Sequence, residues 1–225
     1  TSTLLKAGFH YQYGTHKLNF GWQLIHYQFN PGSLEPTSSV SNAKEYSLDK
    51  QYSIENAFFI NDEWSLKENL FIEAGLRLPL FMSFGPAAIN RYEAGEPIEI
   101  TNVVDTVHYG KGEITKTYLG VEPRVSIRWN VGPTSSLKFG YNHLYQFLHL
   151  VTNSTAVTPV DIWQPSGYYF KPQQSDQVSI GYFRDFREKK YGASMEAYYK
   201  SVNHVLDFKD GAQLILNPHL ETDLL

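Results

Sequence analysis

The sequence predicts an all-β protein, an antiparallel up-and-down sheet whose roughly eight strands form part of a larger transmembrane β-barrel. Apolar and polar residues alternate with a period of two over much of the chain, which indicates strands rather than helices. Short and long joints between these segments alternate without exception. No run of 18 or more apolar residues is present, so transmembrane helices are not expected.

The alternation places the strands in four hairpins. In the stretch "VEPRVSIRWNVGPTSSLKFGYNHLYQF", for example, Val125 and Ile127 alternate with Arg124 and Arg128. A half-buried soluble sheet gives the same pattern, so the alternation by itself leaves the membrane question open. The expected strands, taken in order along the chain, cover residues 4–13, 17–29, 52–64, 70–81, 119–129, 137–142, 177–182 and 191–200.

The lengths of the joints favour a membrane barrel over a soluble sheet. Joints near residues 15, 67, 133 and 188 span roughly three to five residues, whereas the joints between hairpins span roughly 20 to 30, well beyond the usual loop length. Residues 85–115 are expected to be one such long loop. In an up-and-down sheet every short turn then falls at one end and every long loop at the other, which is typical of an outer-membrane barrel. Aromatic residues near strand ends match an interfacial girdle: Tyr13, Phe29, Trp64, Trp129 and Phe186.

Composition excludes several classes of protein. The chain has 225 residues, no cysteine and a formal net charge of -4, with 15% aromatic residues. The absence of cysteine excludes a disulfide scaffold and a thiolate metal site. No Lys/Arg cluster offers a phosphate footprint, so a nucleic-acid partner is not expected.

Three segments carry a resemblance to a known family: "NAFFINDEWSLKENLFIEAGLRL", "YLGVEPRVSIRWNVGPTSSLKFGYNHLYQFLHL" and "QQSDQVSIGYFRDF" with the "YGASMEAYYKSVNHVLDF" that follows it. In order and spacing they resemble the barrel of TonB-dependent outer-membrane receptors, and especially the subgroup that carries a carboxypeptidase-regulatory-like domain. The resemblance covers the whole chain. It implies a 22-stranded barrel plugged by an N-terminal domain, which imports scarce ligands with energy drawn from the TonB complex.

The chain departs from the full family pattern. The plug, the TonB-contacting box, the remaining strands and the terminal aromatic strand are missing, so residues 1–225 are expected to be a partial receptor barrel. The resemblance implies a place in the bacterial outer membrane and, as partners, the lipid bilayer, the receptor's own plug and the TonB complex, with a surface lipoprotein or other outer-membrane proteins as further candidates. The imported ligand is expected to be an iron chelate, cobalamin or a glycan. Two alternatives stay open: a complete eight-stranded structural or adhesive barrel, and a non-transporting subunit of a larger assembly.

Ligand contact is expected in the long loops. The stretch "VDIWQPSGYYFKPQ" combines flat aromatic surface with polar groups suited to stacking on a sugar or chelate ring. Its candidate contacts are Trp163, Gln164, Tyr168, Tyr169, Phe170 and Lys171. The alternative is that these aromatics pack the loop or mark the membrane boundary.

Charged residues on the polar face are expected to line the lumen and contact the plug through salt bridges and ordered water. They are Glu73, Arg77, Glu122, Arg124, Arg128, Lys138, Glu196 and Lys200. A merely solvated polar face would carry the same residues. We expect no enzyme activity, because no G-x-S-x-G elbow gathers Ser, His and Asp, and a barrel hydrolase is a remote alternative. We expect no cofactor and no metal, since His143 and His149 would lie roughly 20 Å apart along one strand.

Overall fold

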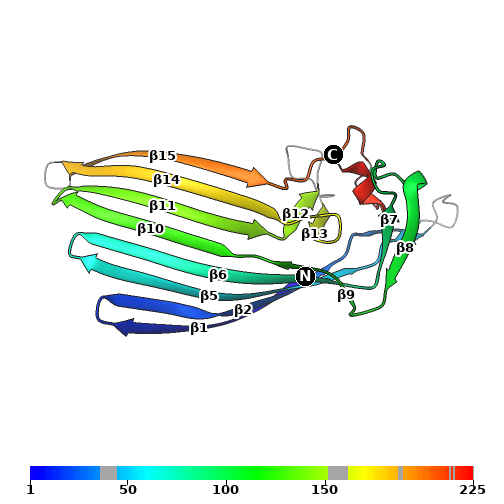
Figure 1. Cartoon of the computed structure of the whole chain (residues 1–225), viewed down its shortest axis with the longest axis horizontal. Helices are drawn as coiled ribbons and strands as arrows, with labels where there is room; N and C mark the ends of the chain where they lie inside the picture. The colour runs from blue at the N-terminus through cyan, green and yellow to red at the C-terminus, as the bar shows by residue number, and fades with distance from the viewer. Residues whose placement is uncertain (36–44, 152–161, 187–189, 213, 215, 225) are drawn as a thin grey trace.

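Eight long strands form one antiparallel sheet in the computed structural model, which describes residues 1–35, 45–151, 162–186, 190–212, 214 and 216–224 (Figure 1). Each strand pairs with its neighbours in chain order. The two edge strands, β1 and β15, lie at opposite sides of the sheet, as in a section of a larger barrel. The strands are β1 (Ser2–Tyr13), β2 (His16–Phe29), β5 (Gln51–Lys67), β6 (Leu70–Phe84), β10 (Glu122–Gly132), β11 (Ser135–Gln146), β14 (Gln173–Phe186) and β15 (Tyr191–Asn203).

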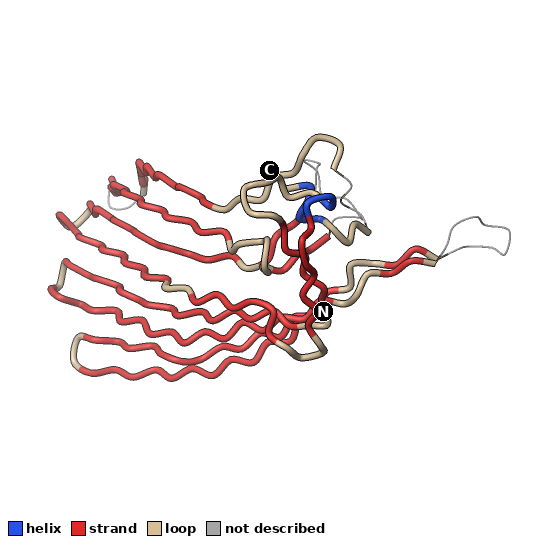
Figure 2. Tube along the Cα trace, turned by 45° about the vertical axis from the view of Figure 1, so that its right-hand side comes forward, coloured by secondary structure: helices blue, strands red, loops and turns tan. Residues whose placement is uncertain are grey.

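The described short turns, after β1, β5 and β10, lie at one end of the sheet and the described parts of the long joints lie at the other, as predicted (Figures 1 and 2). The first turn uses Gly14 in the left-handed region, with φ of 57°. The prediction that the long joints are plain loops is wrong, because each contains a small two-stranded sheet of its own. These pairs are β3 (Ser33–Leu34) with β4 (Tyr46–Ser47), β7 (Ala87–Tyr92) with β8 (Val103–Tyr109), and β12 (Leu148–Val151) with β13 (Ile162–Pro165).

The expected strand 119–129 is interrupted. The region contains β9 (Ile114–Leu119) and β10, which both pair with β6; the register is the same in both, apart from a shift between Ser83 and Phe84 in the β9 pairing. The interruption falls where Gly120 lies opposite Pro79. Proline has no N–H to donate, so the ladder loses a hydrogen bond there, although the Gly120 N–H still donates to the Pro79 carbonyl at 2.8 Å. The two segments therefore act as one interrupted strand of the sheet.

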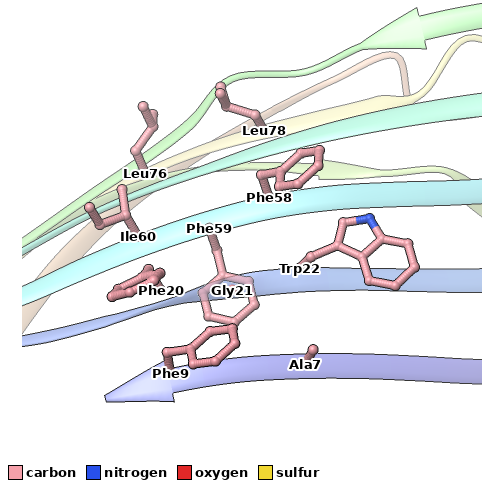
Figure 3. Close-up of a pocket in the computed structure, with 10 residues that line it drawn as sticks. All are labelled: Ala7, Phe9, Phe20, Gly21, Trp22, Phe58, Phe59, Ile60, Leu76 and Leu78. Atoms are coloured by element: carbon pink, nitrogen blue, oxygen red, sulfur yellow. The ribbon is translucent and has the colours of Figure 1, made fainter. Parts of the chain in front are cut away.

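The two faces of the sheet are inverted relative to a soluble protein. On the apolar face Phe58, Ile180 and Met195 are 63%, 58% and 75% exposed. On the opposite face Ser53 is fully buried and Glu122 is 2% exposed. Hydrophobic side chains that face outward while polar ones are covered are the arrangement of a membrane barrel wall. Figure 3 shows a shallow apolar hollow on β1, β2, β5 and β6, of about 390 Å³, where aromatic and aliphatic side chains gather.

A small packed cap sits on the loop end of the sheet. Its buried core consists of Val151, Phe170, Leu214 and Leu220, with the last in the short 3₁₀ helix η2 (Leu220–Asp223). In Figure 1 η2 lies beside β7. A second 3₁₀ turn, η1 (Ile100–Asn102), precedes β8. No helix among the described residues is long and apolar enough to cross a membrane.

Candidate functional site

The loop end of the sheet contains a cavity of about 200 Å³. Its lining includes residues from the ends of β5 and β6, from β7 and β13, and from the C-terminal segment. Its described lining residues include Gln51, Tyr52, Ser83, Phe84, Gln164, Ser166, Tyr168, Tyr169, Phe170, Asn217 and Glu221. Among the described lining residues, Glu221 alone carries a formal charge at neutral pH.

The structure divides the six predicted ligand contacts. Gln164, Tyr168, Tyr169 and Phe170 line the cavity, whereas the lining described for it includes neither Trp163 nor Lys171. Phe170 is 7% exposed and belongs to the packed core of the cap, so the alternative of loop packing applies to this residue. Tyr168 is 44% exposed and presents its ring to the cavity.

Three contacts hold the aromatic residues of the cavity in place. The rings of Tyr168 and Tyr169 meet edge to face, with centroids 5.0 Å apart. The Tyr169 hydroxyl donates to the Asn90 carbonyl of β7. The Lys116 Nζ lies 5.4 Å from the Tyr168 ring centroid, within cation–π range. The ring of Tyr168 is therefore fixed although much of it is exposed.

The C-terminal segment closes the cavity through Glu221. The Tyr92 hydroxyl of β7 donates to Glu221 Oε1 at 2.9 Å. Burial, foremost, raises the pKa of Tyr92 to about 12, and the nearby carboxylate adds to this because both favour the neutral phenol. Burial likewise raises the pKa of Tyr169 to about 12. Both phenols remain donors throughout the physiological range.

A buried chain of polar groups fastens the β12–β13 hairpin to the sheet. His149 Nε2 and Ser166 Oγ are 3.0 Å apart, and the Ser83 hydroxyl donates to the Ser166 carbonyl at 2.6 Å. Gln51 Nε2 donates to Gln164 Oε1 at 3.3 Å. Sequence reasoning missed this chain, because it joins segments up to 113 residues apart and no local motif marks them.

The His149–Ser166 pair is unsuited to nucleophilic catalysis. Ser166 is fully buried, so its hydroxyl is closed to a substrate. Burial lowers the pKa of His149 to about 4, so the imidazole is neutral at physiological pH. No group of three or more His, Cys, Asp or Glu side chains in the described part of the chain is arranged to hold a metal ion.

Two of the charged residues predicted to line the lumen pair with each other inside the wall. Arg77 Nη1 donates to Glu122 Oε2 at 3.0 Å, and Nη2 donates to Glu55 Oε1 at 2.5 Å. Glu122 Oε1 also accepts the backbone N–H of Tyr145 at 2.9 Å, where β11 has left the β10 ladder. The Tyr27 hydroxyl donates to Glu55 Oε2 at 3.3 Å. This network joins five neighbouring strands.

The register places all eight charged residues on the same face. Direct pairs such as Glu122 with Arg77 and Arg128 with Lys138 establish this, since paired residues point the same way. Arg128 and Lys138 lie over aromatic rings, 4.3 Å from Phe71 and 4.2 Å from Phe183 respectively. The remaining members are Glu73, which accepts a hydrogen bond from Asn61 at 3.0 Å, and Arg124, Glu196 and Lys200, which have no ion pair with any described residue.

Open grooves accompany these charges. One of about 400 Å³ is lined by Glu73, Arg124 and Asn142 among others. Another, of about 490 Å³, is lined by Lys17, Arg128 and further residues nearer the short turns. The polar face therefore combines uncompensated charge with room for another surface.

Solved structures of outer-membrane receptors share this fold. The copper transporter OprC matches with a TM-score of 0.58 and 14% identity over 94% of this chain and 32% of that chain. The hemophore receptor HasR of Serratia marcescens, in complex with hemophore HasA and heme, matches with a TM-score of 0.54 and 10% identity over 92% and 33%. The ferric-catecholate import receptor Fiu of E. coli K12 matches with a TM-score of 0.50 and 14% identity over 94% and 32%. At such identities the likeness shows the fold alone.

The chain spans about a third of the length of these structures. No curated protein matches its sequence. The subgroup with a carboxypeptidase-regulatory-like domain remains a prediction. The family model described as TonB dependent receptor-like, beta-barrel matches residues 1–217. The chain therefore belongs to the TonB-dependent receptor β-barrel family of the bacterial outer membrane.

Proposed function

We propose that this chain is part of the wall of a transporter that binds a ligand at its loop end and imports it with energy from the TonB complex. The observation that carries the proposal is the polarity of the sheet: its apolar face is exposed to the surroundings, and its polar face holds charges that have no ion pair with any described residue. The family adds support, since the chain matches its barrel model over nearly the full length.

The unpaired cations support a second component of the proposal, contact with a plug domain. Arg124 and Lys200 have no carboxylate partner among the described residues, and the grooves beside Arg124 and Arg128 leave room for one. Burying such charges without partners would be costly, so the surface that fills the barrel is expected to supply acidic groups. Arg77 is excluded from this role because Glu55 and Glu122 already neutralise it.

Energised uptake is tested in cells. Strains with and without the receptor gene, each with an active or inactive TonB complex, are compared for accumulation of iron chelates, cobalamin and oligosaccharides. Loss of uptake on removing either component supports the proposal. The receptor is instead a non-transporting subunit if it assembles in the outer membrane but uptake of every compound stays the same in all four strains.

Plug contact is tested by reversing charge. Arg124→Glu combined with Lys200→Glu should loosen the plug in the full receptor, and planar-bilayer conductance should rise. Lys111→Glu, on the exposed turn before β9, is the matched control and should leave conductance unchanged. Unchanged conductance in the double variant would show that these two cations do not contact the plug.

A further inference from the structure

The cavity at the loop end is poorly suited to an anionic ligand. No Lys, Arg or His is among its described lining residues, and its one formal charge, on Glu221, is negative. An anion transferred from water into such a site loses its hydration without gaining a paired cation. Ferric chelates with net negative charge would meet a carboxylate there instead of a guanidinium.

The cavity is also poorly suited to a cationic ligand at its aromatic side. The Lys116 ammonium already lies against the Tyr168 ring, 5.4 Å from its centroid. A second cation stacked on this ring would be repelled by the first. Glu221 Oε1 is already engaged by the Tyr92 hydroxyl. The charges around the cavity therefore favour a neutral occupant.

Neutral hydrogen-bonding groups remain available. Gln51 Oε1 is a buried acceptor without a partner among the described residues. Tyr52 and Tyr168 also line the cavity, and their hydroxyls make no hydrogen bond to any described residue. An unmade bond at a buried amide costs free energy that a ligand hydroxyl would recover. The acceptor and the two hydroxyls thus fit a ligand rich in O–H groups.

The remaining features set the size and shape of the ligand group. The fixed, half-exposed Tyr168 ring offers a flat apolar face, on which the C–H face of a ring can stack. The volume of about 200 Å³ is smaller than the ~300–1,000 Å³ of pockets that enclose a whole ligand. It accommodates one ring of a longer molecule.

We infer that this cavity is a subsite for one neutral sugar unit of an oligosaccharide, with Tyr168 stacking on the ring and Gln51 Oε1 accepting a ligand hydroxyl. The inference rests on the proposed function, whose ligand class it names. The expected ligand of the receptor is therefore a neutral glycan and not an anionic chelate.

The test is calorimetric titration of the purified full receptor in detergent. The probes are neutral oligosaccharides of glucose, mannose, xylose and galactose units, an oligogalacturonate as their acidic counterpart, a ferric tris-catecholate and a cationic oligopeptide. At least one neutral oligosaccharide should bind. Tyr168→Ala and Gln51→Leu should each raise its Kd about threefold to tenfold, since each removes one stacking or hydrogen-bonding contact.

Controls separate binding from folding. Tyr46→Ala removes an exposed tyrosine of the neighbouring β4, which is not among the cavity's described lining residues, and should leave Kd unchanged. Because Gln51 is half-buried, each variant is first checked for the heat-dependent gel mobility of a folded barrel. Should Gln51→Leu fail to fold, the exposed Tyr168 variant alone decides.

Three results would overturn the inference: no neutral oligosaccharide binds, the catecholate or the peptide binds and loses affinity in Tyr168→Ala, or neutral binding is the same in both cavity variants as in Tyr46→Ala. Since purified receptor needs no TonB complex to bind, these results leave the transport proposal standing. If uptake in cells does not depend on TonB while the purified receptor still binds a neutral oligosaccharide, the transport proposal is overturned and the proposed subsite stands.

Discussion

The Arg77 guanidinium donates to Glu122 Oε2 at 3.0 Å between the neighbouring strands β6 and β10. Glu122 is 2% exposed, and its other oxygen replaces a missing ladder partner for Tyr145 where β10 and β11 separate. The pair therefore fastens the sheet on the loop side, where the ladder between β10 and β11 ends. With Glu55 as second partner, Arg77 is held by two carboxylates.

Replacing Arg77 by Met should destabilise the full receptor by about 3–5 kcal/mol, because it leaves two buried carboxylates without their shared cation. Urea unfolding in lipid vesicles, followed by tryptophan fluorescence, measures the free energy. Lys111→Met is the control: Lys111 lies on the exposed turn before β9 and has no ion pair among the described residues, so the free energy should change by less than about 0.5 kcal/mol. Equal effects of the two variants would show that the network contributes nothing to the stability of the wall.

Ile127 tests the assignment of the apolar face. It lies between Ile72 and Phe139 in the pairing of β6, β10 and β11. Ile127→Arg should cost about 2–4 kcal/mol if the site lies near the middle of the bilayer. Ser126→Arg introduces the same side chain on the opposite face, beside Glu73, and should cost far less. Vesicle unfolding measures both, and a reversed order would mean that the faces have been assigned the wrong way round.

His149 makes the β12–β13 hairpin sensitive to acid. Its pKa falls from 6.5 to about 4 on burial, so between these values the unfolded hairpin binds more protons than the folded one. Stability therefore rises with pH in this window: it is full above pH 6.5 and is lost as pH falls toward 4, by roughly 2–3 kcal/mol.

Hydrogen-exchange protection of the hairpin amides, corrected for intrinsic exchange, measures this loss. His149→Gln should remove most of the pH dependence between pH 7 and 4. His108→Gln, at an exposed position of β8, should leave it in place. A wild-type hairpin whose protection is constant over this range would contradict the assigned cause.

Period-two alternation was sufficient to predict the eight long strands and the shared face of the charged residues, because a strand residue's face follows from its parity alone. The hairpins within the loops were missed because strands of two to seven residues, such as β3 and β8, are too short for alternation to be recognised. The cavity itself was not predicted, and the ligand contacts stay a prediction. Tyr168 stands in an aromatic cluster visible in the sequence, whereas Gln51 reaches the cavity through tertiary packing that no local pattern records.

The Arg77 network shows a different limit of sequence reasoning. Glu122 and Arg77 were correctly placed on one face, but their partnership depends on the register of β6 against β10. A shift by two residues would keep both on that face and separate them. The odd or even position of a residue along its strand determines the face on which it lies, but its partner depends on how the neighbouring strand is aligned.

Gly21 provides the last test, at a close approach of β1 and β2. It pairs with Gly8, and the ring of Phe59 lies against it (Figure 3). A Cβ at Gly21 would stand 2.2 Å from the Ala7 carbonyl oxygen and 2.8 Å from Phe59 Cζ. Since the first of these atoms belongs to the backbone, the strands themselves would have to move apart.

Gly21→Ala should therefore destabilise the receptor by about 1–3 kcal/mol, the usual range for overpacking. Gly132→Ala is the matched control, because a Cβ there would meet nothing within 4 Å and the backbone lies outside the left-handed region. It should be neutral, or slightly stabilising through the loss of chain entropy in the unfolded state. Both are measured by urea unfolding in vesicles. If Gly21→Ala proved as stable as Gly132→Ala, the close approach of β1 and β2 at Gly8 would not be a constraint on this wall.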